Sequence, residues 1–138
     1  MTTFRRGLDD PRHRRLFDLW LGKARPPQLP GRQDFSPVEL DFALPHLELL
    51  DRLPDGFRFR LVGSALCELF GTDPTGMTLD EAPETVSAAL GRAECARVAL
   101  TGLPAASSRS LLLPLAENGH DIDMIMACVS AGPREVAR

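Results

Sequence analysis

The residues in this chain that are best suited to chemistry are few and scattered. The densest group of possible metal ligands is His120, Asp121 and Asp123, since imidazole and carboxylate groups bind zinc and similar ions. The group follows a turn dipeptide, Asn118-Gly119, and alternation along an extended strand sends neighbouring side chains to opposite faces. We therefore interpret these residues as the solvated end of a hairpin and expect no metal site.

The three cysteines, Cys67, Cys95 and Cys128, lie far apart, each in an apolar or helical stretch. A cysteine in that context packs as a small hydrophobic residue. We expect reduced packing side chains rather than a disulfide, a metal site or a nucleophile.

An enzyme is not expected, and no catalytic residue is assigned. The sequence has no glycine-rich phosphate loop, no GxSxG elbow and no HExxH helix, which are local signatures of common catalytic sites. Its carboxylates fall in turns and at helix starts, where they cap helices and interact with the helix dipole.

Charge is spread unevenly along the chain. Residues 1–32 hold eight basic and three acidic side chains, a net of +5, while residues 33–138 hold eight basic and sixteen acidic ones, a net of −8. Clustered arginines neutralise nucleic-acid phosphates, so nucleic-acid binding is one alternative for the basic start. We favour a solvated helix face, because the rest of the chain is acidic and the cluster lacks interleaved aromatic residues for base stacking. The arginines in question are Arg5, Arg6, Arg12, Arg14 and Arg15.

Two helices are predicted before the first strand. The first runs from about Pro11 to Gly22, because proline suits a first helical turn and glycine a helix end. Its apolar stripe consists of Leu16, Phe17 and Trp20. A proline-rich connector follows, and then Ser36 is placed to cap a short helix that extends to about Leu44.

A strand hairpin comes next. Residues 46–53 form the first strand candidate, Asp55-Gly56 is a turn, and the alternating run from Phe57 puts Phe59 and Leu61 on one face. Gly63 ends this strand, and Ser64 is expected to cap a helix that stops at Gly71. After a turn at residues 73–76, Thr78 and Glu81 have capping-box spacing, which predicts a second short helix.

The remainder predicts one long helix and three strands. The helix covers residues 84–101 and ends at Gly102, and the strand candidates are residues 103–107, 110–116 and 122–129. Two strands, helices and three strands describe an α+β fold with a five-stranded antiparallel sheet, helices covering one face, and an N-terminal helical extension.

This order is also that of the PAS fold, and the chain resembles a family of short, stand-alone bacterial PAS-domain proteins over about residues 13–130. The matching pieces, in order, are LFDLW, LPGRQDFSPVEL, LPHLELLD, FRFRLVGSAL, FGTDPTGMTL, LLLPLAENG and IDMIMA. The resemblance implies a PAS-like domain over residues 44–130, preceded by an extension and connector at 1–43 and followed by a C-terminal tail at 131–138.

The resemblance also implies a pocket and a role in sensing or signalling, without naming a ligand. The alternative is that the same side chains fill the core. Arg97 is interpreted either as an anchor for a ligand carboxylate or phosphate or as an exposed helix residue. The candidate pocket residues are Phe59, Leu61, Leu66, Phe70, Met77, Leu90, Arg97, Leu113, Met124 and Met126.

Haem and flavin are not expected as cofactors. Haem-binding PAS domains use a histidine on the long helix, and residues 84–101 contain none. Flavin photoreceptors of this fold carry an NCRFLQ-like motif, which is absent from the sequence.

The sequence thus predicts a sensory or regulatory domain that binds an unidentified small molecule, a signalling partner protein, or both. The partner is expected to be a separate protein, for example a histidine kinase, or a second copy in a homodimer, with Leu16, Phe17 and Trp20 as contact residues. A ligand-free interaction module is the alternative. No window of about 18 apolar residues and no signal-like start occur, so we expect a cytoplasmic protein without membrane insertion.

Overall fold

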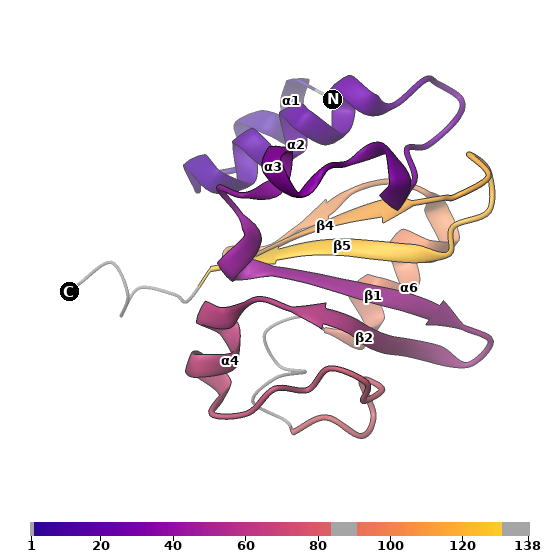
Figure 1. Cartoon of the computed structure of the whole chain (residues 1–138). Helices are drawn as coiled ribbons and strands as arrows, with labels where there is room; N and C mark the ends of the chain where they lie inside the picture. Colours follow the sequence, from indigo (N-terminus) through magenta and orange to yellow (C-terminus); the bar gives the residue numbers. More distant parts are fainter. Residues whose placement is uncertain (1, 84–90, 131–138) are drawn as a thin grey trace.

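A five-stranded antiparallel sheet forms the centre of the molecule, and helices cover both of its faces (Figure 1). The computed structural model describes residues 2–83 and 91–130. The strand order is β2-β1-β5-β4-β3. This confirms the predicted α+β class. The strands are β1 (Leu47–Leu53), β2 (Gly56–Val62), β3 (Ala105–Ala106), β4 (Ser110–Leu115) and β5 (Met124–Val129).

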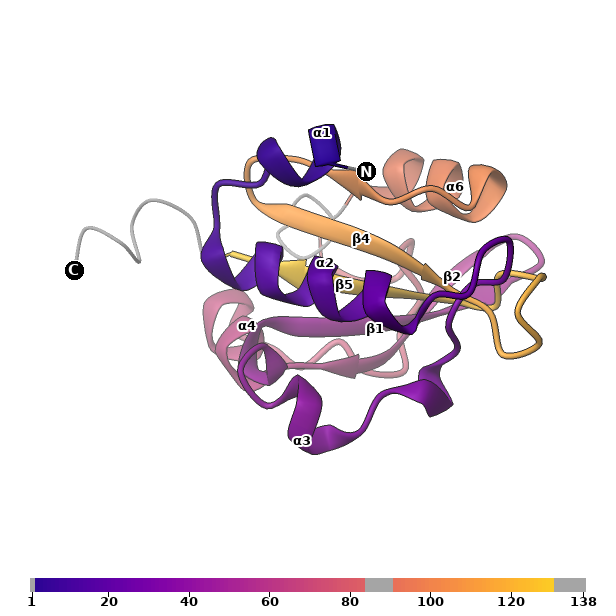
Figure 2. The ribbon, with the colours of Figure 1, turned by 90° about the horizontal axis from the view of Figure 1, so that it is seen from above.

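The helices divide between the two faces. The N-terminal helices α1, α2 and α3 lie over one face, here called the N-terminal face, and α2 runs along the sheet (Figures 1 and 2). Helices α4 and α6 cover the other, here called the α4–α6 face. The bounds are α1 (Thr2–Arg6), α2 (Pro11–Lys23), η1 (Arg32–Asp34), α3 (Pro37–Leu40), η2 (Leu44–His46), α4 (Ser64–Phe70) and α6 (Arg92–Thr101), with η1 and η2 being 3₁₀ helices.

The N-terminal helices are therefore a second layer of the fold. Their apolar stripe packs on the outward side chains of β1, β4 and β5, and the indole nitrogen of Trp20 donates a hydrogen bond of 2.9 Å to the carbonyl of Pro114. Because both faces are covered, every residue of β4 and β5 is buried. Helix α1 was not anticipated from the sequence.

One irregularity in the hairpin changes which face a predicted residue occupies. Across β1 and β2, Leu49 pairs with Leu61 but Leu50 pairs with Phe59, so Arg60 is an extra residue in β2. Such a β-bulge interrupts the two-residue alternation. Phe59 consequently packs in the core of the α4–α6 face, while Leu61 packs against that of the N-terminal face. The prediction that they share a face is wrong for this reason.

The α4–α6 face shows two further departures. Gly63 itself is the N-cap of α4, and its lack of a side chain is required, because a Cβ would lie 2.3 Å from the carbonyl oxygen of Pro45. The predicted capping role of Ser64 is therefore wrong. Thr78 and Glu81 do exchange the capping-box hydrogen bonds, of 2.9 and 3.2 Å, but residues 79–81 form a turn rather than a helix.

Two predicted helices also differ in their bounds from the helices in the structure. The cap of α3 is confirmed, because Ser36 and Glu39 exchange hydrogen bonds of 2.9 and 3.2 Å, but α3 ends at Leu40 instead of near Leu44. The long helix expected over 84–101 begins at Arg92 in its described part. Gly91 precedes it with a φ of 83°, which is incompatible with a continuous helix through that residue. Residues 84–90 and the tail at 131–138 lie outside the described residues.

No helix in the described parts of the chain is long and apolar enough to cross a membrane.

Candidate functional site

An apolar cavity of about 240 Å³ lies between the connector that follows α2 and the N-terminal face of the sheet. We call it the junction cavity. Its floor is made by side chains of β1, β2, β4 and β5, and its roof by the segment from η1 to η2. The lining residues are Arg32, Phe35, Pro37, Leu40, Leu44, Leu47, Leu49, Leu61, Leu115 and Met126.

The roof is held in place by contacts that the sequence pattern explains. The capping box of α3 orients Glu39, whose carboxylate also accepts a 2.6 Å hydrogen bond from Lys23 at the end of α2. The bulge at Arg60 turns Leu61 to this side of the sheet. The cavity thus depends on the N-terminal segment as much as on the hairpin.

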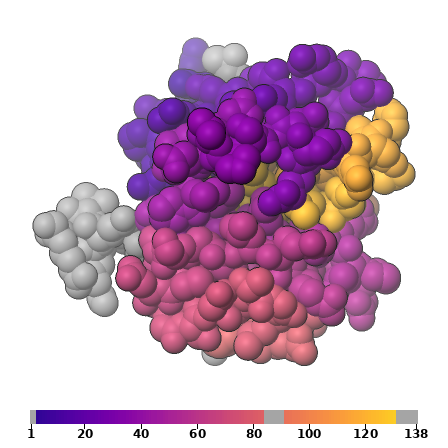
Figure 3. Space-filling view, viewed as in Figure 1, coloured from indigo at the N-terminus to yellow at the C-terminus, as the bar shows by residue number. Residues whose placement is uncertain are grey.

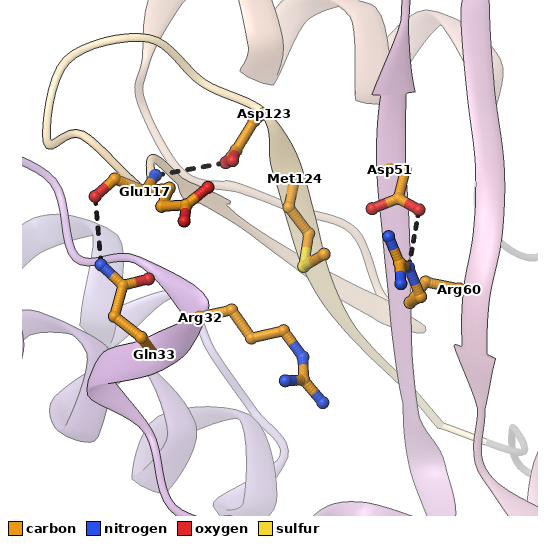
Figure 4. A pocket seen from close by; sticks show the side chains of 7 residues that line it. All are labelled: Arg32, Gln33, Asp51, Arg60, Glu117, Asp123 and Met124. Atoms are coloured by element: carbon orange, nitrogen blue, oxygen red, sulfur yellow. Dashed lines mark hydrogen bonds and ion pairs between the residues drawn. The ribbon is translucent and has the colours of Figure 1, made fainter.

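A polar groove of about 410 Å³ adjoins the cavity, and the two share Arg32. In the space-filling view, yellow residues of the β4–β5 region show between the indigo-to-purple N-terminal segment and the magenta hairpin (Figure 3). The groove is lined by Arg32, Gln33, Asp51, Arg60, Glu117, Asp123 and Met124 (Figure 4).

Most polar groups of the groove already have partners. Arg60 forms a 2.8 Å ion pair with Asp51 across the hairpin. The amide of Gln33 donates to the carbonyl of Glu117 at 3.0 Å, and the backbone nitrogen of Glu117 donates to Asp123 at 3.3 Å. These contacts fix the connector against the β4–β5 loop.

Arg32 differs from its neighbours. It is exposed, and none of the described carboxylates lies within ion-pairing distance of it. Its side chain extends from the connector into the open space beside Met124, away from Gln33 and Glu117 (Figure 4). A guanidinium offers five hydrogen-bond donors in a planar fork, so Arg32 presents an unpartnered donor group where the groove meets the apolar cavity.

The structure divides the predicted pocket residues between the two faces. Leu61 and Met126 line the junction cavity, Met124 lines the groove, and Leu113 is buried on the same face. Phe59 and Leu66 are buried in the core of the α4–α6 face, and Phe70 packs against it. The sheet separates the two groups, which corrects the expectation of one inward-facing set.

Of the other three predicted residues, Met77 and Arg97 belong to neither group. Met77 is 37% exposed. Arg97 lies on the exposed surface of α6, where it forms an ion pair with Glu94 one turn away. Leu90 lies outside the described residues.

The three residues predicted as a partner surface are inside the molecule. Leu16 and Phe17 are fully buried and Trp20 is 3% exposed, all against the chain's own sheet. The prediction that these residues contact a partner protein is therefore wrong, because their apolar stripe packs against the sheet of the same chain.

A buried acid on the α4–α6 face was not anticipated. Glu48 lies on β1 between Leu47 and Leu49, which face the other way. Its side chain is fully buried, and among the described residues neither carboxylate oxygen has a hydrogen-bond partner. Burial raises the pKa of Glu48 to about 8, so the carboxyl is largely protonated at neutral pH. An acid inside an apolar strand, as in LELL, is the signal that sequence analysis overlooked.

A second unanticipated cluster joins α2 to the end of β5. The Ser130 hydroxyl donates to Asp10 at 2.6 Å and lies 3.3 Å from Nε2 of His13, and Asp10 lies 3.7 Å from that same nitrogen. A catalytic triad uses both imidazole nitrogens, one for serine and one for aspartate. This arrangement uses only one, so it is a structural link. Burial lowers the pKa of His13.

The cysteines lie in the packing environments that the sequence suggested. Cys95 and Cys128 are fully buried, and burial raises the pKa of each thiol to about 12. Cys67 is half-buried, and its thiol donates to the carbonyl of Val62 at 3.7 Å.

His120 and Asp121, two of the possible metal ligands in the sequence, belong to a turn that the side chain of Asn118 organises. The Asn118 side chain accepts hydrogen bonds from the backbone of His120 and Asp121, at 2.9 and 2.8 Å. Among the described residues, no group of three or more possible ligands is arranged to hold a metal ion.

Several N-terminal arginines make contacts within the chain. Arg5 forms a 2.9 Å ion pair with Asp18, Arg14 donates to the carbonyl of Leu8 at 2.6 Å, and Arg15 lies 4.1 Å above the ring of Phe42. These contacts spread the three guanidinium groups over different partners.

Comparison with known proteins places the chain in a family. Residues 8–130 match a family model described as PAS domain. No curated protein and no solved structure matches significantly.

Proposed function

The chain belongs to the PAS domain family, and we propose that it is a sensory domain that binds a small molecule in its junction cavity. PAS domains are sensory or regulatory modules rather than catalytic ones. The observation that carries the proposal is the cavity itself, which is apolar and lies beside a groove with a few polar groups. Ligand sites in proteins combine these two features.

The size of the site supports a ligand larger than water. A volume of about 240 Å³ is roughly eight times the ~30 Å³ share of one water molecule in the liquid. Together with the adjoining groove, the site reaches the ~300–1,000 Å³ range of small-molecule pockets. The roof comes from the N-terminal segment, so occupancy would bear directly on how that segment packs. We propose that a partner protein or a second copy of the chain reads this change.

A cavity-filling variant tests the proposal. A small-molecule library is screened by thermal shift, because a ligand that binds only the folded state raises the melting temperature. The screen is repeated with Leu61→Phe, which adds volume inside the cavity, and with Leu69→Phe, which alters an exposed position on α4.

The expected result is a set of compounds that stabilise the wild-type chain and Leu69→Phe but lose most of their effect on Leu61→Phe. Compounds that stabilise all three proteins equally would place the binding site elsewhere. A broad library without a single stabilising compound would contradict ligand binding.

A further inference from the structure

The charges around the junction cavity define which ligand it accepts. Arg32 lines the cavity, Arg60 lines the adjoining groove, and Lys23 holds the roof through Glu39 of α3. The ammonium of Lys23 is paired with Glu39, and the guanidinium of Arg60 is paired with Asp51. Of these three basic side chains, Arg32 alone has no partner among the described residues.

The backbone position of Arg32 is fixed, although its guanidinium has no partner in the part of the chain that the structure describes. The backbone nitrogen of Gly31, immediately before it, donates to Asp34 at 2.9 Å, and Gln33, immediately after it, is bonded to the β4–β5 loop. A ligand that bonds to Arg32 therefore does not have to order the backbone that carries it, which reduces the entropic cost of binding.

The far end of the groove has the opposite charge. Glu117 and Asp123 lie at the β4–β5 loop, on the side away from the guanidinium of Arg32 (Figure 4), and neither has a described basic side chain as an ion-pair partner. A second negative group on the ligand would be repelled there. Within the cavity itself, the other nine lining side chains are all apolar, so a charge there would lose its hydration without compensation.

On these grounds we infer that the junction cavity binds an amphipathic monocarboxylate, with its apolar tail in the cavity and its carboxylate on Arg32. The inference rests on the proposed function and specifies the ligand of the same site. A guanidinium and a carboxylate match in charge and in bidentate geometry. The rim is open to water, so the ionic contact contributes modestly, and the tail supplies most of the affinity.

Four ten-carbon probes separate the contributions of the head group and the tail. They are decanoate, decan-1-ol, decylamine and the dicarboxylate sebacate, each used below its micellar concentration, with binding measured by calorimetry. Decanoate is expected to bind about fivefold to tenfold more tightly than decan-1-ol, which corresponds to about 1–1.4 kcal/mol. Decylamine and sebacate are expected to bind more weakly than decanoate.

Arg32→Gln and Arg6→Gln provide the matched pair. Both remove an exposed arginine without a described side-chain partner, but Arg6 lies on α1, outside the cavity lining. Arg32→Gln should remove the preference for decanoate over decan-1-ol, while Arg6→Gln keeps it. Both variants are expected to unfold at the wild-type temperature, since neither position is buried.

Other results would overturn the inference while leaving the proposed function testable. Equal binding of decanoate and decan-1-ol, tightest binding of decylamine, or an unchanged preference in Arg32→Gln would each refute the assigned carboxylate. If no ten-carbon probe binds, the ligand class is wrong, whereas the proposed function fails only if the library screen also yields no compound sensitive to Leu61→Phe.

Discussion

The two faces of the sheet contain similar apolar cores but differ in where they keep charge. The α4–α6 face buries the carboxyl of Glu48, which has no hydrogen-bond partner within residues 2–83 and 91–130. The N-terminal face contains an apolar cavity, and at its solvent-exposed rim lies the guanidinium of Arg32, which likewise has no partner in these two ranges. A buried, unpaired acid reduces stability and responds to pH, whereas an exposed cation beside a cavity costs the fold little and is available to a ligand. The first face is therefore expected to respond to pH and the second to a ligand.

The largest expected change in stability comes from removing a buried phenylalanine from either face of the sheet. Phe17 is fully buried on the N-terminal face and Phe59 is 1% exposed on the other. Replacing either with alanine leaves a large cavity, which lowers the free energy of unfolding by about 3–5 kcal/mol. Urea denaturation of Phe17→Ala and Phe59→Ala measures both. If Phe17→Ala alone lowered the free energy of unfolding by less than about 1 kcal/mol, the N-terminal helices would contribute little to the stability of the fold. The two faces would then not be comparable cores.

A smaller effect, confined to one pH range, should come from Glu48. Its pKa is about 8 in the folded state against an ordinary value of 4.5, so the folded state holds the proton more tightly than the unfolded state. The associated stability is fully present below about pH 4.5 and is lost as the pH rises to about 8. Glu48→Gln, which stays neutral, should not show this loss, and its free energy of unfolding should exceed that of the wild type by a growing margin, on the order of a few kcal/mol.

Chemical denaturation at several pH values between 4 and 9 measures this margin. Glu68→Gln, on the exposed side of α4, is the matched control and should follow the wild type. A margin between wild type and Glu48→Gln that stays constant with pH would mean that Glu48 ionises as readily in the folded chain as in the unfolded one.

Much of the fold was predictable, because its signals are local. The turn signal between two apolar runs marked the hairpin, although the turn itself is Pro54-Asp55 rather than Asp55-Gly56, because Gly56 already pairs with Leu53 as the first residue of β2. Asn118-Gly119 marked the turn before the last strand, as the structure confirms. Ser36, Pro37 and Glu39 marked the start of α3. Each of these depends on a few neighbouring residues, which a sequence displays directly.

The helical layer over the N-terminal face was harder to predict, but the sequence contains a signal for it. The runs SLLLPL and MIMACV are apolar almost without interruption, and strands of this kind are buried on both faces. That pattern indicates a cover on the outer face, and the apolar stripe of α2 is the segment that supplies it. Interpreting Leu16, Phe17 and Trp20 as a partner surface overlooked this match within the chain.

The candidate site was not predictable in full, because it depends on tertiary detail. The bulge at Arg60 leaves the alternation of FRFRLV intact in the sequence, yet it moves Leu61 to the face with the cavity. Likewise, nothing in the sequence distinguishes Arg32 from Arg60, since being paired or unpaired depends on which carboxylate lies nearby in the folded chain.

The four methionines of the chain allow the most direct test of where a ligand binds. Met126 lines the junction cavity and Met124 the groove, whereas Met77 follows the turn after α4 and lines neither. In a chain labelled with ¹³C at the methionine methyl groups, titration with decanoate should shift the Met126 signal most, the Met124 signal less, and the Met77 signal hardly at all. A spectrum in which Met126 stays fixed while decanoate binds, or in which Met77 shifts most, would contradict a ligand site on the N-terminal face.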